Sequence, residues 1–119
     1  MTKILLAEDD NDMRRFLVKA LQNAGYDVAS FDNGLSAYNR LREEPFELLL
    51  TDIVMPEMDG PTLLGELRQR NPNTKVVFVS GYAEDAFARN LPQDAKFGFL
   101  PKPFSLKQLA QAVREMLDG

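Results

Sequence analysis

Leucine occupies positions 48, 49 and 50 in succession, with no polar residue between them. A strand with one face in water alternates apolar and polar side chains, whereas a strand buried on both faces does not. The run therefore predicts a strand, Glu47–Thr51, in a parallel sheet covered by helices on both faces. Asp52 follows directly, so a carboxylate lies at the carboxyl end of that strand, the edge where open α/β sheets bind ligands.

Strand-like and helix-like segments alternate along the whole chain. Apolar residues at three- and four-residue steps predict helices, and short runs rich in β-branched residues predict strands. Strands are predicted at 3–7, 27–31, 47–51, 75–80 and 97–100, and helices at about 13–24, 37–41, 61–71, 83–90 and 105–117. We therefore expect an α/β fold, a five-stranded parallel doubly wound sheet of the flavodoxin-like type with five helices. The order 2-1-3-4-5 is the common one at this size.

Two local signals refine this prediction near the C-terminus. Pro101 lies within the last predicted strand and lacks a backbone donor, which predicts that this strand is at the edge of the sheet. Ser105 and Gln108 have the spacing of a capping box, which predicts that the final helix begins there.

Composition excludes several classes of function. The 119 residues suit one domain, 1–119, and include no His and no Cys. Ser-His-Asp and Cys-His catalysis, disulfides and the usual zinc sites are therefore excluded. The net charge of −4 argues against direct binding of nucleic acid or anionic membranes. The N-terminus does not have the pattern of a secretory signal, and no apolar run approaches the ~20 residues that span a membrane.

Polar residues that can do chemistry follow four of the predicted strands. The first strand leads into Glu8–Asp10, the third into Asp52, the fourth ends in Ser80 and the fifth leads into Lys102. If the first and third strands are neighbours, their carboxylates lie close together and repel one another. A hard divalent cation such as magnesium relieves that repulsion through oxygen ligands. Lys102 supplies a compact positive charge to the same edge.

A carboxylate surrounded by a cation, an ammonium and a hydroxyl is suited to receive a phosphoryl group. The transferred group carries negative charge on three oxygens, so its transfer depends mainly on positioning and neutralisation. Each residue alone has an ordinary structural explanation: Glu8–Asp10 as a solvated turn or helix N-terminus, Asp52 as a cap, Ser80 as a satisfied hydroxyl and Lys102 as a surface residue. Their joint occurrence at successive strand ends favours the phosphoacceptor hypothesis.

The same segments resemble the receiver domain of two-component response regulators over nearly the whole chain. The matching pieces are ILLAEDD, LLLTDIVMPEMDG, VVFVSG and FLPKPF. The resemblance implies that Asp52 is the phosphoacceptor and that Glu8 and Asp9 are the acidic pair that binds Mg²⁺, which Mn²⁺ would replace. It also implies that the backbone carbonyl of Val54, two residues beyond the acceptor, is a further metal ligand.

The resemblance assigns roles near the fourth and fifth strands too. Ser80 matches the hydroxyl residue that contacts the phosphoryl group, and Lys102 matches the family lysine, followed by a cis bond to Pro103. Phe99 matches the aromatic switch position, which is Phe here instead of Tyr, so a hydroxyl-mediated contribution to signalling is missing. Pro101 departs from the family pattern and is expected to stiffen this loop.

The implied partners are a histidine phosphotransfer protein of the ChpT type or a sensor histidine kinase, in the bacterial cytoplasm. Docking is expected over the first helix, around Met13 and Arg14, and over Pro103–Ser105. Residues 1–60 resemble stand-alone receivers, whereas 78–85 and 99–113 resemble the receiver of a hybrid kinase. A natural relative of both and a chimera joined near 58–60 both remain open. A monomer is expected, without a DNA-binding output because the chain ends after the last predicted helix.

Three other functions compete with the phosphoacceptor hypothesis. A magnesium phosphatase of the haloacid dehalogenase type would need a second Asp where Val54 stands. A flavodoxin-like carrier of a nucleotide or flavin would need a first loop rich in Ser, Thr and Gly, whereas Glu8–Asp10 would repel phosphate. A receiver fold used only for docking, and never phosphorylated, would have no need for the complete set of site residues.

Overall fold

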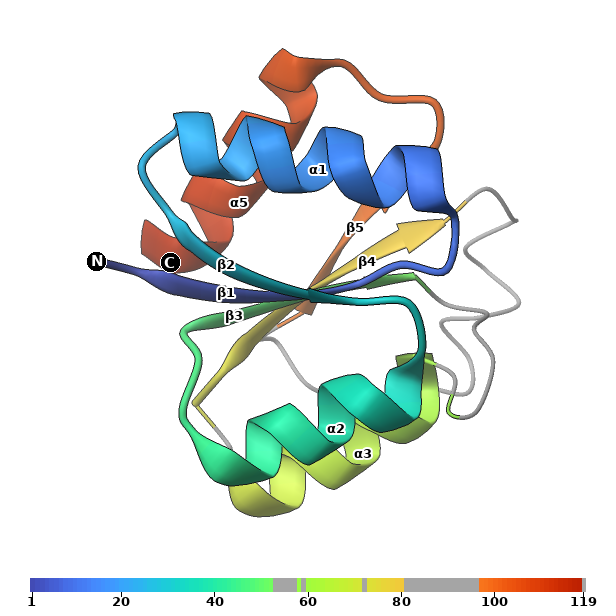
Figure 1. The fold of residues 1–119 in the computed structure, drawn as a ribbon. Coiled ribbons are helices and arrows are strands. Elements are labelled where there is room, and N and C mark those ends of the chain that lie inside the picture. The colour runs from blue at the N-terminus through green and yellow to red at the C-terminus, as the bar shows by residue number, and fades with distance from the viewer. Residues whose placement is uncertain (53–57, 59, 72, 81–96, 119) are drawn as a thin grey trace.

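The computed structural model describes residues 1–52, 58, 60–71, 73–80 and 97–118 (Figure 1). The elements are β1 (Lys3–Ala7), α1 (Asn11–Asn23), β2 (Asp27–Phe31), α2 (Gly34–Glu43), β3 (Leu48–Asp52), α3 (Gly60–Arg70), β4 (Lys75–Ser80), β5 (Phe97–Pro101) and α5 (Leu106–Asp118). The strands form one parallel sheet in the order β2-β1-β3-β4-β5, so the expected topology is confirmed. In the described part of the chain, no helix is both long and apolar enough to span a bilayer.

Helices cover both faces of the sheet, with α1 and α5 on one side and α2 and α3 on the other (Figure 1). Leu48 and Leu50 pack with the core cluster under α1 and α5, while Leu49 packs with the cluster under α2 and α3. All three side chains are fully buried. The missing alternation in this strand thus reflects two separate apolar cores, one on each face of the sheet.

Local hydrogen bonds fix the helix ends, and the sequence predicted some of them. Ser105 N donates to Gln108 Oε1 at 2.8 Å and Gln108 N donates to Ser105 Oγ at 3.1 Å, so the predicted capping box is confirmed. Asp10 caps α1 by accepting from Met13 N at 2.9 Å. Gly25, with φ of 95°, follows the end of α1 in the left-handed conformation that glycine tolerates.

The structure differs from the expectations in the number of helices described and in the bounds of one strand. The described residues contain four helices and not the five expected, because the helix expected at 83–90 lies outside them. The third strand begins and ends one residue later than predicted, since Asp52 still pairs with Val79 of β4. The expected edge position of the strand containing Pro101 is confirmed, because β5 lies at one edge of the sheet.

Candidate functional site

The parallel register of β1 and β3 brings acidic residues from distant parts of the chain to one point. Ala7 of β1 lies opposite Thr51 of β3, so the next residues along the two strands, Glu8 and Asp52, are adjacent at the carboxyl edge of the sheet. Glu8 N donates to Phe31 O of β2 at 3.0 Å, which holds this end of β1 against its other neighbour. Position in the sheet, and not proximity in sequence, creates the acidic pair.

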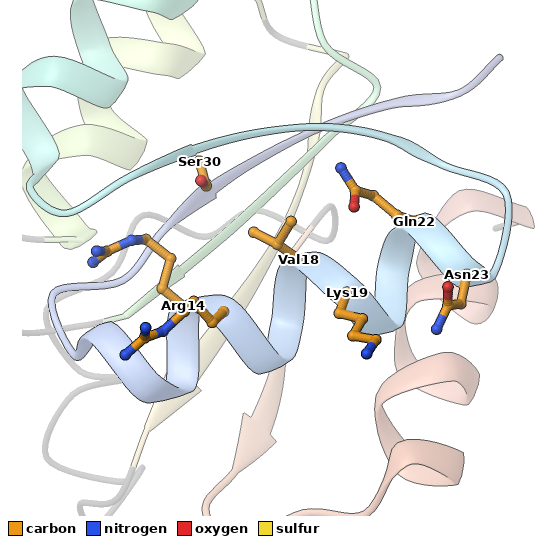
Figure 2. A pocket seen from close by; sticks show the side chains of 7 residues that line it. Arg14, Val18, Lys19, Gln22, Asn23 and Ser30 are labelled. Atoms are coloured by element: carbon orange, nitrogen blue, oxygen red, sulfur yellow. The ribbon is translucent and has the colours of Figure 1, made fainter.

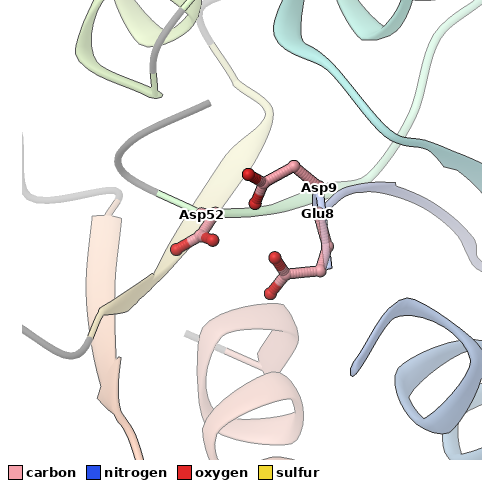
Figure 3. A group of neighbouring side chains, drawn as sticks. All are labelled: Glu8, Asp9 and Asp52. Carbon is pink, nitrogen blue, oxygen red and sulfur yellow. The ribbon is translucent and has the colours of Figure 1, made fainter. Parts of the chain in front are cut away.

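Three carboxylates meet at this edge (Figure 3). Glu8, Asp9 and Asp52 each offer an oxygen atom, and these atoms lie within 4.8 Å of one another. Glu8 is 1% exposed, the Asp52 side chain is 14% exposed and Asp9 is exposed, so the cluster runs from the interior to the surface. The third acid of the predicted loop, Asp10, is occupied as the α1 cap.

Lys102 brings a positive charge to the same cluster. Its Nζ lies 3.3 Å from Glu8 Oε1 and 3.6 Å from Asp52 Oδ2. The lysine follows β5 directly, and its peptide bond to Pro103 is cis, the isomer that the family resemblance implied. The ammonium therefore contacts carboxylates from two different strands, as the sequence predicted for the end of the fifth strand.

The surroundings of the site shift the pKa values of Glu8 and Lys102. Burial first, and then the neighbouring Asp52, raise the pKa of Glu8, while the Asp10 backbone N–H and Lys102 act in the opposite direction; together they leave this pKa at about 7. Burial by itself lowers the pKa of Lys102, but the attraction of Asp52 and Glu8 outweighs burial and leaves that pKa raised. At neutral pH the lysine is therefore charged, whereas Glu8 is near its titration midpoint.

The donor set fits a hard divalent cation. Glu8 Oε1 is buried and accepts no hydrogen bond, although it is paired with Lys102 in charge. Three carboxyl groups share the site with one ammonium, so a divalent cation bound there would balance the negative charge that they carry when ionised. Carboxylate oxygens are the ligands that Mg²⁺ prefers, and the exposed Asp9 leaves one side open to the waters that Mg²⁺ keeps.

The raised pKa of Glu8 predicts a pH-dependent stability in buffers stripped of divalent cations. Between pH 4.5 and about 7 the folded protein holds a proton that the unfolded chain has lost, so stability falls as pH rises through this window. The expected loss is roughly 1–3 kcal/mol. Urea unfolding at pH 5 to 8 measures it, and the chain has no His to confuse the result. The dependence should be absent in Glu8→Gln; an equally steep curve in that variant would contradict the assignment.

The other predicted site residues are described only in part. Ser80 ends β4 opposite Pro101, one position beyond the Asp52–Val79 pair, and its side chain lies outside the described set. Val54 also lies outside the described residues. Phe99 is half-buried, with its ring centroid 5.9 Å from that of Phe78.

One contact at the site was not predicted. Arg14 Nη1 donates to the backbone carbonyl of Glu8 at 2.8 Å, and Nη2 donates to Asn11 Oδ1 at 2.5 Å. The same arginine lines a cavity of about 520 Å³ on the β2 side of α1, together with Lys19 and Ser30 (Figure 2). The acidic cluster does not line this cavity. The sequence signal for the contact is weak, because an arginine in a first helical turn is common in any protein.

Comparison with known proteins gives a consistent result. Residues 4–114 match the response regulator receiver domain family. The response regulator receiver protein CpdR of Brucella abortus is 57% identical over 119 residues, which cover 98% of this chain and 98% of that protein. The sensor kinase CckA of Brucella abortus is 58% identical over 117 residues, covering 97% of this chain but only 12% of the kinase.

Solved structures show the same fold. The crystal structure of the receiver domain from the hybrid histidine kinase CckA superimposes with a TM-score of 0.83 at 33% identity, covering 97% of this chain and 98% of that one. The receiver domain of a Pseudomonas aeruginosa sensor histidine kinase superimposes with a TM-score of 0.89 at 22% identity, covering 99% and 98%. That crystal structure has a magnesium ion coordinated in its active site cleft.

Proposed function

The chain belongs to the response regulator receiver domain family of two-component phosphorelays, and on this premise we propose that its Asp52 accepts a phosphoryl group from a phosphohistidine donor. The observation that carries the proposal is the meeting of Asp52 with Glu8, Asp9 and Lys102 at one edge of the sheet. Family membership also separates the chain from the aspartyl phosphatases and flavin carriers considered above.

In the proposed step, a carboxylate oxygen of Asp52 attacks the phosphorus atom in line with the bond to the donor imidazole. The P–N bond breaks, its electron pair stays with the imidazole nitrogen, and that nitrogen takes a proton from solvent. Lys102 then faces the negative charge on the phosphoryl oxygens, where an ammonium stabilises the transition state. Later attack by water on phosphorus breaks the new P–O bond, releases inorganic phosphate and restores the carboxylate.

We assign magnesium binding to Glu8, Asp9, Asp52 and the backbone carbonyl of Val54. When bound, the cation would neutralise phosphoryl oxygens, and Mn²⁺ would substitute for it. The clustered oxygens and the buried Glu8 Oε1 without a hydrogen bond support this assignment. Magnesium in the active site cleft of the Pseudomonas aeruginosa receiver domain supports it further.

Ser80 and Phe99 are assigned to signal output. Ser80, one position beyond Val79 in β4, would donate its hydroxyl to the phosphoryl group. Phe99 would then repack further inward beside Phe78, which changes the surface around β5 and α5. Such a switch is a shift between two packings of one fold, biased by the new charge.

The test is labelling with acetyl phosphate and Mg²⁺, followed by intact-mass measurement and peptide mapping. We expect a single phosphoryl adduct on the peptide containing Asp52, and no adduct in Asp52→Asn or without the cation. Equal labelling of Asp52→Asn would overturn the assignment of the acceptor. If neither acetyl phosphate nor a phosphohistidine donor labels the parent protein, the chain acts as a docking module and the proposed function is wrong.

We further propose that the donor is a histidine phosphotransfer protein of the ChpT type, which docks across α1 and α5 in the bacterial cytoplasm. Phe16 is 40% exposed and Leu106 is 57% exposed, although both are large and apolar. The Phe16 ring lies 6.5 Å from that of Phe104, and an adjacent groove of about 220 Å³ is lined by Phe16, Ala20 and Leu106. Exposed apolar side chains gathered in this way are typical of protein interfaces.

Phe16→Ala is expected to slow phosphotransfer from such a partner about tenfold or more, because a central aromatic contact is removed. Labelling by acetyl phosphate, which needs no docking, should be unchanged. Leu35→Ala is the matched control, since Leu35 is 41% exposed but lies on α2, on the opposite face of the sheet. Rates measured with the purified phosphorylated partner decide the matter, and equal losses in both variants would contradict the proposed docking face.

A further inference from the structure

Gly34, the first residue of α2, is in unusually close contact with the backbone of the segment between β3 and α3. A Cβ atom built on Gly34 would lie 1.7 Å from the carbonyl oxygen of Met58 and 2.6 Å from its carbonyl carbon. Real Cβ atoms are essentially never found within 3.0 Å of another heavy atom of this kind. Only a residue without a side chain allows the N-terminus of α2 to lie against Met58.

We propose that Gly34 is a positioning residue for the Asp52 site, because it lets α2 hold the far end of the segment that leaves Asp52. Met58 is six positions beyond Asp52, and Val54, to which we assign a metal-ligating carbonyl, lies between them. The inference rests on the proposed function, since it concerns the geometry of that same site. It adds a residue from a different element, α2.

The requirement for glycine here comes from contact and not from backbone conformation. Among the described glycines, the left-handed φ is found at Gly25, where it is 95°. Gly34 has an ordinary φ and begins a helix, so alanine would be the better residue for local helix formation. The clash with Met58 is therefore the reason that a side chain is not tolerated.

The backbone of Met58, and not the helix, would yield to an added side chain. Ala37 is 0% exposed and Leu41 is 4% exposed in the core under α2, which leaves the helix no room to retreat. Asn33 also fixes the first turn by accepting from Ser36 N at 2.8 Å. Met58 packs against the same core but is only half-buried, so it is held less firmly than Ala37 and Leu41. A methyl group at Gly34 would therefore displace the Met58 backbone by roughly 1 Å or more, a shift that at a reactive centre lowers rates about 100-fold.

The experiment compares Gly34→Ala with Gly65→Ala. A Cβ at Gly65, within α3, would meet nothing within 4 Å, so the second variant makes the same chemical change without the clash. Mg²⁺ affinity and the rate of labelling by acetyl phosphate are measured at a temperature where circular dichroism shows each variant folded. We expect Gly34→Ala to lose about 10- to 100-fold in both quantities, and Gly65→Ala to match the parent. If Gly34→Ala is less stable but keeps parental Mg²⁺ affinity and labelling, its role is only structural and the inference is overturned.

A measurement on the unaltered protein covers the case in which Gly34→Ala does not fold. Mg²⁺ is titrated into ¹⁵N-labelled protein, and the amide resonances of Gly34, Gly65 and Gly25 are followed. We expect the Gly34 resonance to shift over the same range of Mg²⁺ concentration that saturates the Asp52 site. The Gly65 and Gly25 resonances should not shift. If the Gly34 resonance does not shift in a protein that does bind Mg²⁺, this inference alone is overturned. A parent protein that neither binds Mg²⁺ nor is labelled at Asp52 overturns the proposed function instead.

Discussion

Replacing Lys102 with glutamine is expected to slow labelling of Asp52 by acetyl phosphate about 100- to 1,000-fold, the usual effect of removing a positioned charge from a transition state. Lys102 Nζ lies 3.6 Å from Asp52 Oδ2, at the point where phosphoryl oxygens would carry their charge. Glutamine retains a polar side chain but removes the charge. Initial rates of adduct formation at saturating Mg²⁺ measure the effect.

The same substitution should strengthen Mg²⁺ binding several-fold, because the ammonium no longer competes with the cation for Glu8 and Asp52. Opposite changes in rate and affinity cannot come from a general loss of structure. Lys107→Gln is the matched control, since it makes the same change of net charge at an exposed position on α5. Parental labelling rates in Lys102→Gln would contradict the role assigned to this lysine.

Replacing Phe78 with alanine is expected to lower the free energy of unfolding by about 3–5 kcal/mol, the usual cost of truncating a buried aromatic side chain. Phe78 is 0% exposed on β4 and packs in the cluster under α2 and α3. Small domains have only about 5–15 kcal/mol of stability in total, so the variant loses a large share of it. Urea unfolding at fixed pH and Mg²⁺ concentration measures the change.

Phe16→Ala provides the matched control, because it removes the same side chain from a position that is 40% exposed. We expect it to lose clearly less, about 1–2 kcal/mol, since 40% of its surface stays in water and less apolar area is removed from water on folding. Equal losses at Phe78 and Phe16 would mean that burial in the β4 core does not dominate the stability of the fold.

The sequence predicted the fold well, because its signals were local and repeated. Three consecutive leucines are needed only where both faces of a strand are buried, and Leu49 indeed packs on the opposite side from Leu48 and Leu50. The capping box at Ser105 was also readable, since its two hydrogen bonds join residues three positions apart. The helix expected at 83–90 had little apolar periodicity and stays a prediction.

The sequence also indicated which residues belong to the candidate site, but not all of their roles. From the residue pattern alone, Glu8–Asp10 is a run of three equivalent acids, and only the family resemblance selected Glu8 and Asp9; in the structure Asp10 caps α1, and Glu8 and Asp9 lie beside Asp52. Which of the three acids caps α1 depends on the residue at which α1 begins and on the direction of its first turn. A linear sequence does not specify that direction.

The sequence by itself determined the number, order and type of most of the elements, and the chemistry available at the strand ends. These properties follow from side-chain patterns within a few residues. Only the tertiary structure decided that Lys102 lies between Glu8 and Asp52, that burial shifts the pKa of Glu8 to about 7, and that Gly34 contacts Met58. Contact distances and desolvation depend on how elements far apart in the sequence pack together, and that packing is a property of the whole fold.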